Sequence, residues 1–158
     1  MTLPNDPEQL LEFANGIIAQ QSFSTLIGAR FTAIGDGIAT LEVPLRDDLR
    51  QHHGFAHGGL MGSMADITLT FVGALHLGPQ VLTSEFKINF IRPAVGEKLV
   101  ARGQLVGGTS RQAVTRCDIY AVRSGEDGQL GEDRQPSEKL VATALGTIAL
   151  PDAAPRSS

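Results

Sequence analysis

The stretch QHHGFAHGGLMGSMAD, residues 51–66, concentrates residue types that could do chemistry. It contains three histidines, a Gly58-Gly59 pair and a single aspartate, Asp66, in an otherwise apolar segment. The first N–H groups of a helix have no partner within the helix, and the helix dipole makes that end positive. If a helix begins at the glycine pair, those N–H groups could bind a carbonyl oxygen that becomes negative during a reaction, as an oxyanion hole does. A tight loop before a buried helix would use the same glycines.

The segment from about 58 to 76 is predicted to form that helix. At about 100° per residue, one set of apolar side chains falls within roughly 80° of arc, broad enough to lie against a sheet. This set is Leu60, Met64, Ile67, Phe71 and Leu75. A second, nearly opposite face gathers Gly59, Gly62, Asp66, Thr70 and Gly73. Because interior glycine costs about 0.5–1 kcal/mol relative to alanine, this face indicates close contact with another backbone or a ligand. Asp66 is then either a hydrogen-bonded structural group at a subunit contact or a catalytic carboxylate in a cleft.

The histidines and the single cysteine do not indicate a metal site. No cysteine partner and no H-E-x-x-H pattern accompanies His52, His53 and His57, so zinc spacing is absent. His57, next to the glycines, fits an orienting hydrogen-bond role. Cys117 lies in the alternating run AVTRCDIYAV, which indicates a strand position rather than a nucleophile. We expect neither a metal nor another cofactor.

Length and composition limit the classes of protein to which this chain could belong. A chain of 158 residues with 42% hydrophobic and 19% charged residues is typical of one globular domain. The net charge of −4 offers no broad basic surface for nucleic acid. The N-terminus lacks the features of a signal peptide, and no apolar run approaches the length of a membrane span. With one cysteine and therefore no internal disulfide, the chain fits the cytoplasm.

The remaining elements follow from periodicity and turn residues. Residues 7–20 are predicted to form a helix with Asp6 as N-cap and Pro7 at its first position. Residues 27–45 form two alternating runs joined at Gly35-Asp36-Gly37, which indicates a β-hairpin. Four more strand-like runs follow the long helix, at 81–93, 97–108, 111–124 and 138–151. The polar stretch 124–137 is predicted to be a mobile hairpin loop. This order predicts one antiparallel α+β domain.

With these elements around its motif, the sequence resembles the hotdog-fold thioesterases, in the PaaI-like group of the 4-hydroxybenzoyl-CoA thioesterase superfamily. The resemblance spans roughly residues 22–150. It rests on QHHGFAHGG, on Asp66 nine residues after His57, and on SEFKINFIRPAVGEKLVARG after the helix. It implies a long central helix wrapped by a curved antiparallel β-sheet, with active sites at a dimer interface, usually within tetramers. The chain would then comprise an N-terminal helical segment (1–21), a hotdog domain (22–150) and a disordered tail (151–158).

The resemblance also implies roles for individual residues. Asp66 matches the catalytic carboxylate, acting as a base on water or as a nucleophile. Gly58 matches the residue whose N–H polarises the thioester carbonyl, and His57 the histidine that supports its loop. Gln51 stands where many relatives have an asparagine that places water or substrate. Thr83 stands where a serine or threonine from the partner subunit assists.

The substrate would carry coenzyme A. Arg92 and Arg111 are candidates for its phosphates, because the forked donors of arginine suit phosphate, and Gly59 is a further candidate for substrate contact. The leading hypothesis is hydrolysis of an acyl-CoA thioester to free acid and coenzyme A by a homodimer or homotetramer. The alternative is a hotdog protein that binds acyl-CoA or acyl carrier without turnover. Hotdog dehydratases are disfavoured because their acid-then-histidine helix is absent.

Overall fold

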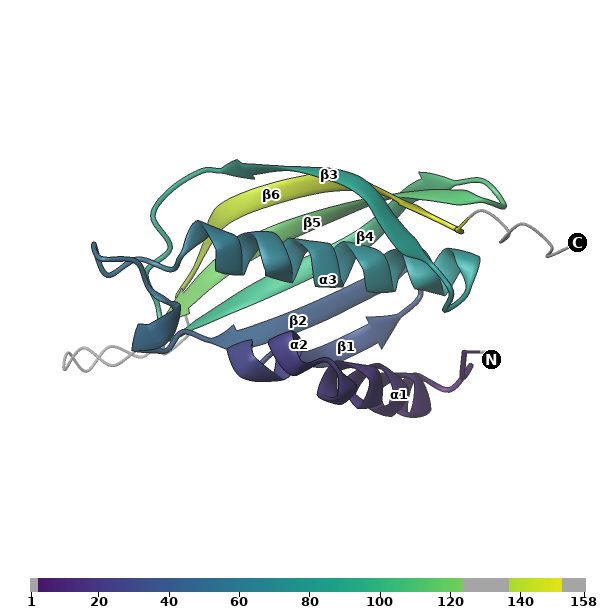
Figure 1. Ribbon diagram of the computed structural model, residues 1–158, viewed down its shortest axis with the longest axis horizontal. Coiled ribbons are helices and arrows are strands. Elements are labelled where there is room, and N and C mark those ends of the chain that lie inside the picture. Colours follow the sequence, from purple (N-terminus) through teal and green to yellow (C-terminus); the bar gives the residue numbers. More distant parts are fainter. Residues whose placement is uncertain (1–2, 124–136, 152–158) are drawn as a thin grey trace, which may run out of the picture.

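The computed structural model describes residues 3–123 and 137–151. A six-stranded antiparallel sheet wraps around one long helix, α3 (Gly58–Leu77), and two shorter helices, α1 (Pro7–Gln20) and α2 (Ser22–Ile27), lie beside β1 (Figure 1). The predicted α+β fold with a long central helix is therefore confirmed. Apart from Ser137 and Pro151, the predicted mobile loop 124–137 and disordered tail 151–158 lie outside the described residues.

All six predicted strands are confirmed. They are β1 (Arg30–Gly35), β2 (Ile38–Pro44), β3 (Leu82–Phe90), β4 (Lys98–Gly108), β5 (Gln112–Arg123) and β6 (Ser137–Ala149). Their order in the sheet is β1-β2-β4-β5-β6-β3. The strand that follows α3 in the chain, β3, is therefore an edge strand that pairs with β6. A 3-10 turn, η1 (Asp47–Leu49), precedes the loop that leads into α3.

Local chemistry explains the N-terminal elements. The Asp6 carboxylate accepts a hydrogen bond from the Gln9 N–H at 3.0 Å, and Pro7 occupies the first turn of α1, as predicted. The β1–β2 hairpin turns at Asp36 (φ 51°) and Gly37 (φ 74°). Two consecutive positive φ angles are typical of the primed turns that match strand twist. The short helix α2 was not expected from the sequence.

The core lies between α3 and the concave side of the sheet. Fully buried side chains from the sheet meet the helix, among them Leu41, Leu99, Ile119 and Ile148. The buried face of α3 differs in part from the predicted stripe. It comprises Leu60, Met61, Met64, Ala65, Thr68, Leu69, Val72 and Gly73. The other predicted stripe members, Ile67, Phe71 and Leu75, are only partly buried against the core, because the sheet curves around the helix and α1 covers a further side of it.

The expectation that no apolar run approaches span length needs correction for α3. This helix has 20 residues and a mean hydropathy of 1.4, enough by length and composition to cross a membrane. Its packing against β3, β4, β5 and β6 identifies it as the core helix of the domain.

Candidate active site

The carboxylate of Asp66 is held by a threonine from the edge strand. Asp66 lies half-buried in the second quarter of α3, and its Oδ1 accepts a hydrogen bond of 2.7 Å from Thr83 Oγ1 of β3. Its Oδ2 has no hydrogen-bond partner among the described residues. The carboxylate is therefore oriented through one oxygen and available through the other.

A β-bulge explains why Thr83 reaches Asp66. In a regular strand alternate side chains face the same side, so Thr83 would face away from Phe86 and Ile88, which pack against the core. The pairing with β6 shifts between Thr83 and Glu85. The extra residue, Ser84, reverses the alternation, and Thr83 turns toward α3. Bulges re-aim side chains in this way beside active sites.

Thr70 completes a small network that we call the carboxylate group, consisting of Asp66, Thr70 and Thr83. Thr70 Oγ1 lies 2.7 Å from Thr83 Oγ1 and 2.7 Å from the backbone carbonyl oxygen of Asp66. Each hydroxyl has one proton to donate. Since the bond to a charged carboxylate is the stronger one, Thr83 donates to Asp66 Oδ1. The single Thr70 proton is then shared between the Asp66 carbonyl oxygen and Thr83 Oγ1. The sequence placed Thr70 on this face, four residues after Asp66, but gave it no role.

The start of α3 presents a second group, which we call the helix-start group, consisting of Gln51, His57 and Gly58. His57 is the N-cap, and its Nδ1 accepts the Gly59 N–H at 2.9 Å. The Leu60 N–H donates to the His57 carbonyl oxygen at 3.0 Å. The Gly58 N–H has no partner among the described residues. Gly58 is thus the free donor of the first turn, whereas Gly59 is already occupied.

The three residues of the helix-start group can be compared with the roles expected of them. Gly58 keeps the open donor expected of an oxyanion hole, and His57 holds the loop beside it through Gly59. Gln51 lies in the preceding turn, where its backbone N–H donates to the Phe55 carbonyl oxygen at 2.8 Å. No hydrogen bond joins the Gln51 side chain to Asp66 among the described residues.

Within one chain the two groups are too far apart to act on one carbonyl. Gly58 and Asp66 are separated by eight residues of continuous helix, which is about 12 Å along the axis. Asp66 and Thr83 meet in the same chain, whereas the resemblance implied a threonine from the partner subunit. Within one chain the helix-start group and the carboxylate group are therefore separate, and the separation falls between Gly58 and Asp66.

The glycines expected on one face of α3 separate into two kinds. A Cβ on Gly62 would meet nothing within 4 Å, so this position is open. A Cβ on Gly73 would lie 2.5 Å from Ile148 Cγ2 of β6. Gly73 is therefore buried against the sheet, and its predicted place at a subunit contact is wrong. In the N-terminal half of α3, Gly59 is exposed and Gly62 and Asp66 are partly buried, and we call the surface around these three residues the open surface of the helix.

Beside this open surface lies the unpaired edge of β3. The strand pairs with β6 on one side and with no described strand on the other. Large apolar side chains on it and just after it are exposed: Leu82 is 62%, Phe90 54% and Ile91 45% exposed. A free edge with apolar side chains is a ready template for pairing with another chain.

The two arginines proposed for phosphate lie at opposite ends of α3. Arg92 is exposed just after β3, near the helix start, where the Ala56 N–H donates to the Ala94 carbonyl oxygen at 2.9 Å. Arg111 lies in the β4–β5 turn, where its N–H donates to Thr109 Oγ1. The Thr109 carbonyl oxygen in turn lies 3.0 Å from His76 Nε2 in the last turn of the helix. The structure of one chain does not bring the two guanidinium groups together.

Other reactive groups fall outside this region. Cys117 is fully buried in β5, and loss of hydration raises the pKa of its thiol to about 12. It is therefore protonated at neutral pH and cannot act as a nucleophile. Among the described residues no group of three or more histidine, cysteine, aspartate or glutamate side chains could hold a metal ion.

Comparison with known proteins shows the family and the fold of the chain. The sequence profile of the thioesterase superfamily matches residues 53–127, which include Gly58, Asp66 and Thr83. A thioesterase family protein from Silicibacter pomeroyi is 30% identical, with a TM-score of 0.74 over 86% of this chain and 93% of that chain.

Two further solved structures share the fold at lower identity. A thioesterase from Haemophilus influenzae is 22% identical, with a TM-score of 0.71 over 88% of each chain. A variant of the phenylacetic acid degradation protein PaaI from Thermus thermophilus is 23% identical, with a TM-score of 0.66 over 82% of this chain and 99% of that chain.

Proposed function

Because this chain belongs to the thioesterase superfamily, in its hotdog-fold PaaI-like group, we propose that it hydrolyses an acyl-CoA thioester to a free acid and coenzyme A. The observation that carries the proposal is the carboxylate of Asp66. Thr83 orients one of its oxygens at 2.7 Å, and the other is free of partners among the described residues. A thioester is activated enough that one carboxylate, one water and one oxyanion donor suffice for hydrolysis.

The complete site needs two copies of the chain. Pairing the free edge of β3 with the same edge of a second copy about a twofold axis runs the two α3 helices antiparallel. Such closed, self-complementary contacts are the commonest in homo-oligomers. Gly58 of one copy then approaches Asp66 of the other across the open surface at Gly62. The separation of these residues by about 12 Å within one helix supports a shared site, and the pairing of such dimers into a homotetramer remains part of the proposal.

The hydrolysis proceeds by direct attack of water in the route we favour. Asp66 Oδ2 takes a proton from a water molecule, and the water oxygen forms a bond to the thioester carbon. The carbonyl oxygen becomes negative and accepts the Gly58 N–H of the other copy, reinforced by the positive end of α3. The carbon–sulfur bond then breaks, and the proton passes from Asp66 to the departing thiolate. Asp66 ends the cycle as a carboxylate.

In the second route Asp66 is the nucleophile. Its Oδ2 attacks the carbonyl carbon, expels the thiolate and forms a mixed anhydride, which water then cleaves. A single turnover in oxygen-18 water, with enzyme in excess, distinguishes the routes. Direct attack places the heavy oxygen in the acid product at once. An unlabelled acid from the first turnover, with the label in Asp66, would require the nucleophilic route.

The remaining residues have supporting roles in the proposal. His57 holds the Gly58 loop by accepting the Gly59 N–H. Gln51 places water or substrate from the helix-start group. Arg92 and Arg111, from opposite ends of α3, bind coenzyme A phosphates. The buried free thiol of Cys117 supports a cytoplasmic location.

Release of free thiol tests the proposal. Purified protein is mixed with a panel of aromatic, short-chain and long-chain acyl-CoAs, and coenzyme A is detected with a thiol reagent. We expect turnover of at least part of the panel, at a rate proportional to enzyme. Saturable binding of acyl-CoA without any thiol release would contradict hydrolysis and favour the non-catalytic binding protein.

A further inference from the structure

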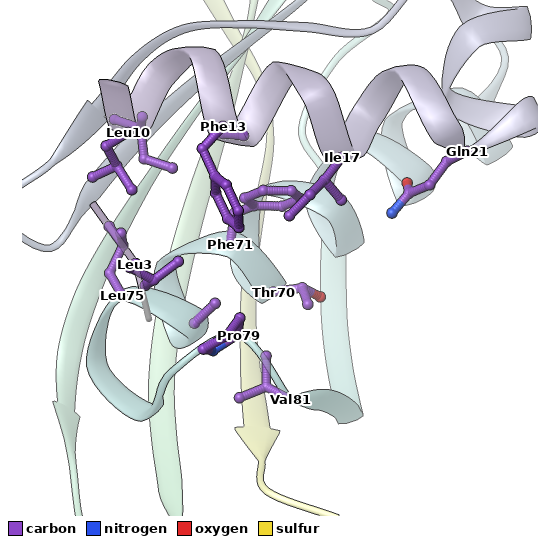
Figure 2. Close-up of a pocket in the computed structure, with 13 residues that line it drawn as sticks. Leu3, Leu10, Phe13, Ile17, Gln21, Thr70, Phe71, Leu75, Pro79 and Val81 are labelled. Carbon is purple, nitrogen blue, oxygen red and sulfur yellow. The ribbon is translucent and has the colours of Figure 1, made fainter. Parts of the chain in front are cut away.

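A pocket between α1 and the C-terminal half of α3 adjoins the carboxylate group. Its volume is about 170 Å³, and Figure 2 shows side chains of the two helices facing each other across it. The side chains that line it are mostly apolar, including Leu10, Phe13 and Ile17 of α1 and Phe71 and Leu75 of α3. No charged side chain lines it among the described residues.

The pocket is continuous with the candidate site through Thr70. This residue lines the pocket, and its hydroxyl lies 2.7 Å from Thr83 Oγ1, which orients Asp66. Thr70 is four residues after Asp66, about 6 Å along the helix. Val81, two residues before Thr83, also lines the pocket.

The polar and apolar lining residues lie toward different ends. Figure 2 shows Thr70 and Gln21 toward one end of the pocket, with Leu10 and Leu75 toward the other. The end nearest Asp66 is therefore the polar one. A group that starts at a carbonyl near Asp66 and becomes apolar with distance matches this gradient.

We propose that this pocket holds the acyl group of the substrate and selects a compact apolar one, either a single aromatic ring or a chain of about six or seven carbons. The inference rests on the proposed thioester hydrolysis. An apolar cavity of about 150 Å³ accommodates benzene, and this pocket is slightly larger at about 170 Å³. Long chains exceed that volume, and a free carboxylate at the far end of the acyl group would lose its hydration without finding a charged partner in the lining.

The inference assigns α1 to substrate recognition. Residues of α1 line one wall of the pocket, with Phe13 among them, although the helix lies outside the region that carries the catalytic motif. Changes of side-chain size on this helix are expected to change which acyl group fits while Asp66, Thr83 and Gly58 keep their geometry.

Filling the pocket tests the inference with a matched control. Ala74 lines the pocket, and Ala74→Leu places a larger side chain in it. Ala19 is exposed on α1, so Ala19→Leu makes the same change outside the pocket. The kcat/KM of each protein is measured with acetyl-, hexanoyl-, phenylacetyl-, decanoyl- and palmitoyl-CoA. We expect the wild type and Ala19→Leu to favour hexanoyl- or phenylacetyl-CoA by about tenfold or more over acetyl- and palmitoyl-CoA.

Ala74→Leu is expected to lower kcat/KM about tenfold or more for the hexanoyl and phenylacetyl substrates and less than about threefold for acetyl-CoA. Phe13→Ala enlarges the pocket and should raise kcat/KM for decanoyl-CoA relative to hexanoyl-CoA. This second variant decides the matter if Ala74→Leu does not fold.

The outcomes separate this inference from the proposed function. A wild type that hydrolyses thioesters but prefers palmitoyl-CoA overturns the acyl pocket and leaves the hydrolase standing. So does a substrate profile that neither pocket variant changes. If no thioester is hydrolysed at all, the proposed function fails and the acyl pocket fails with it.

Discussion

Two glycines on the same helix have opposite surroundings. Gly62 and Gly73 lie about three turns apart on α3. A Cβ on Gly73 would lie within 2.5–2.8 Å of three Ile148 atoms, whereas a Cβ on Gly62 would meet nothing within 4 Å. Packing within the chain therefore explains why position 73 is glycine but gives no reason for glycine at position 62. The sheet-facing surface of α3 is packed within one chain, whereas the open surface around Gly62 is not covered by the described residues.

The hydrogen bonds of the carboxylate group and the helix-start group differ in the same way. The carboxylate group is joined by contacts of 2.7 Å within one chain. In the helix-start group the Gly58 N–H remains without a partner among the described residues. The donor that is left open and the glycine that is left uncovered lie on adjacent turns of α3. Both features lie where the proposed second copy of the chain would approach.

The largest expected effect comes from the carboxylate. Asp66→Asn keeps the shape of the side chain and its acceptor for Thr83 but removes the base, so we expect kcat to fall by about 10²–10⁴-fold. Unfolding temperature and substrate binding should change little, because asparagine still accepts the Thr83 hydrogen bond and position 66 is only partly buried.

Asp118→Asn is the matched control for this change. Asp118 is a carboxylate on β5 that accepts a hydrogen bond from Thr143 at 2.6 Å, and its replacement should leave kcat near the wild-type value. Near-normal turnover by folded Asp66→Asn would rule out the catalytic assignment, and loss of folding would favour a structural carboxylate.

The next effect comes from the oxyanion donor. Gly58→Pro removes the N–H at the first helical position, where proline is tolerated. The preceding His57, at φ −66° and ψ 137°, already has the extended backbone that proline requires. We expect kcat to fall by about 10²–10³-fold. Gly58→Ala retains the N–H, and its Cβ would meet Phe90 at an ordinary 3.5 Å, so steady-state assays should show a much smaller loss.

A bulky side chain on the open surface should separate the subunits. Gly62→Leu adds volume where we expect a second α3 to approach, and light scattering should show monomers with little activity and unchanged helix content. Gly16→Leu is the control, because Gly16 of α1 is exposed and its Cβ would also meet nothing within 4 Å. A Gly62→Leu protein that stays oligomeric and active would place the subunit contact elsewhere.

The smallest effect is expected at Gly73, on the sheet-facing surface of α3, and it concerns the stability of the fold. Gly73→Ala forces a Cβ against Ile148 and should lower the free energy of unfolding by about 1–3 kcal/mol, while kcat per folded molecule remains near normal. Gly16→Ala removes glycine from an open helix position and should raise the free energy of unfolding by about 0.5–1 kcal/mol. Urea unfolding at one protein concentration measures both. A Gly73→Ala protein as stable as the wild type would mean that the sheet moves freely away from the helix.

Much of the fold could be predicted from local patterns. Asp6 and Pro7 mark the start of α1, Asp36-Gly37 marks the hairpin, and alternation locates the strands, because these signals depend on neighbours in sequence. Which residues of α3 face the core could be predicted only in part. A helical wheel assumes one flat partner, but this helix is covered by a curved sheet and by α1, so Phe71 is half-buried and Gly73 faces β6.

The site shows the same limit. The sequence placed Asp66, Gly58 and His57 correctly with respect to α3, because helix periodicity fixes their relation. It could not indicate that a bulge at Ser84 turns Thr83 toward Asp66 within the same chain, or that Thr70 supports that contact. Bulges arise from pairing between distant strands, which local sequence does not specify.

Mixing two inactive variants tests most directly whether the active site is shared between chains. Asp66→Asn and Gly58→Pro are each purified, combined in equal amounts, dissociated and reassembled. A mixed dimer pairs the intact Gly58 of one chain with the intact Asp66 of the other in one of its two sites, so random reassembly should restore about a quarter of the wild-type rate. Mixed dimers that form, as shown by mass spectrometry of tagged chains, yet recover no activity would contradict a site shared between subunits.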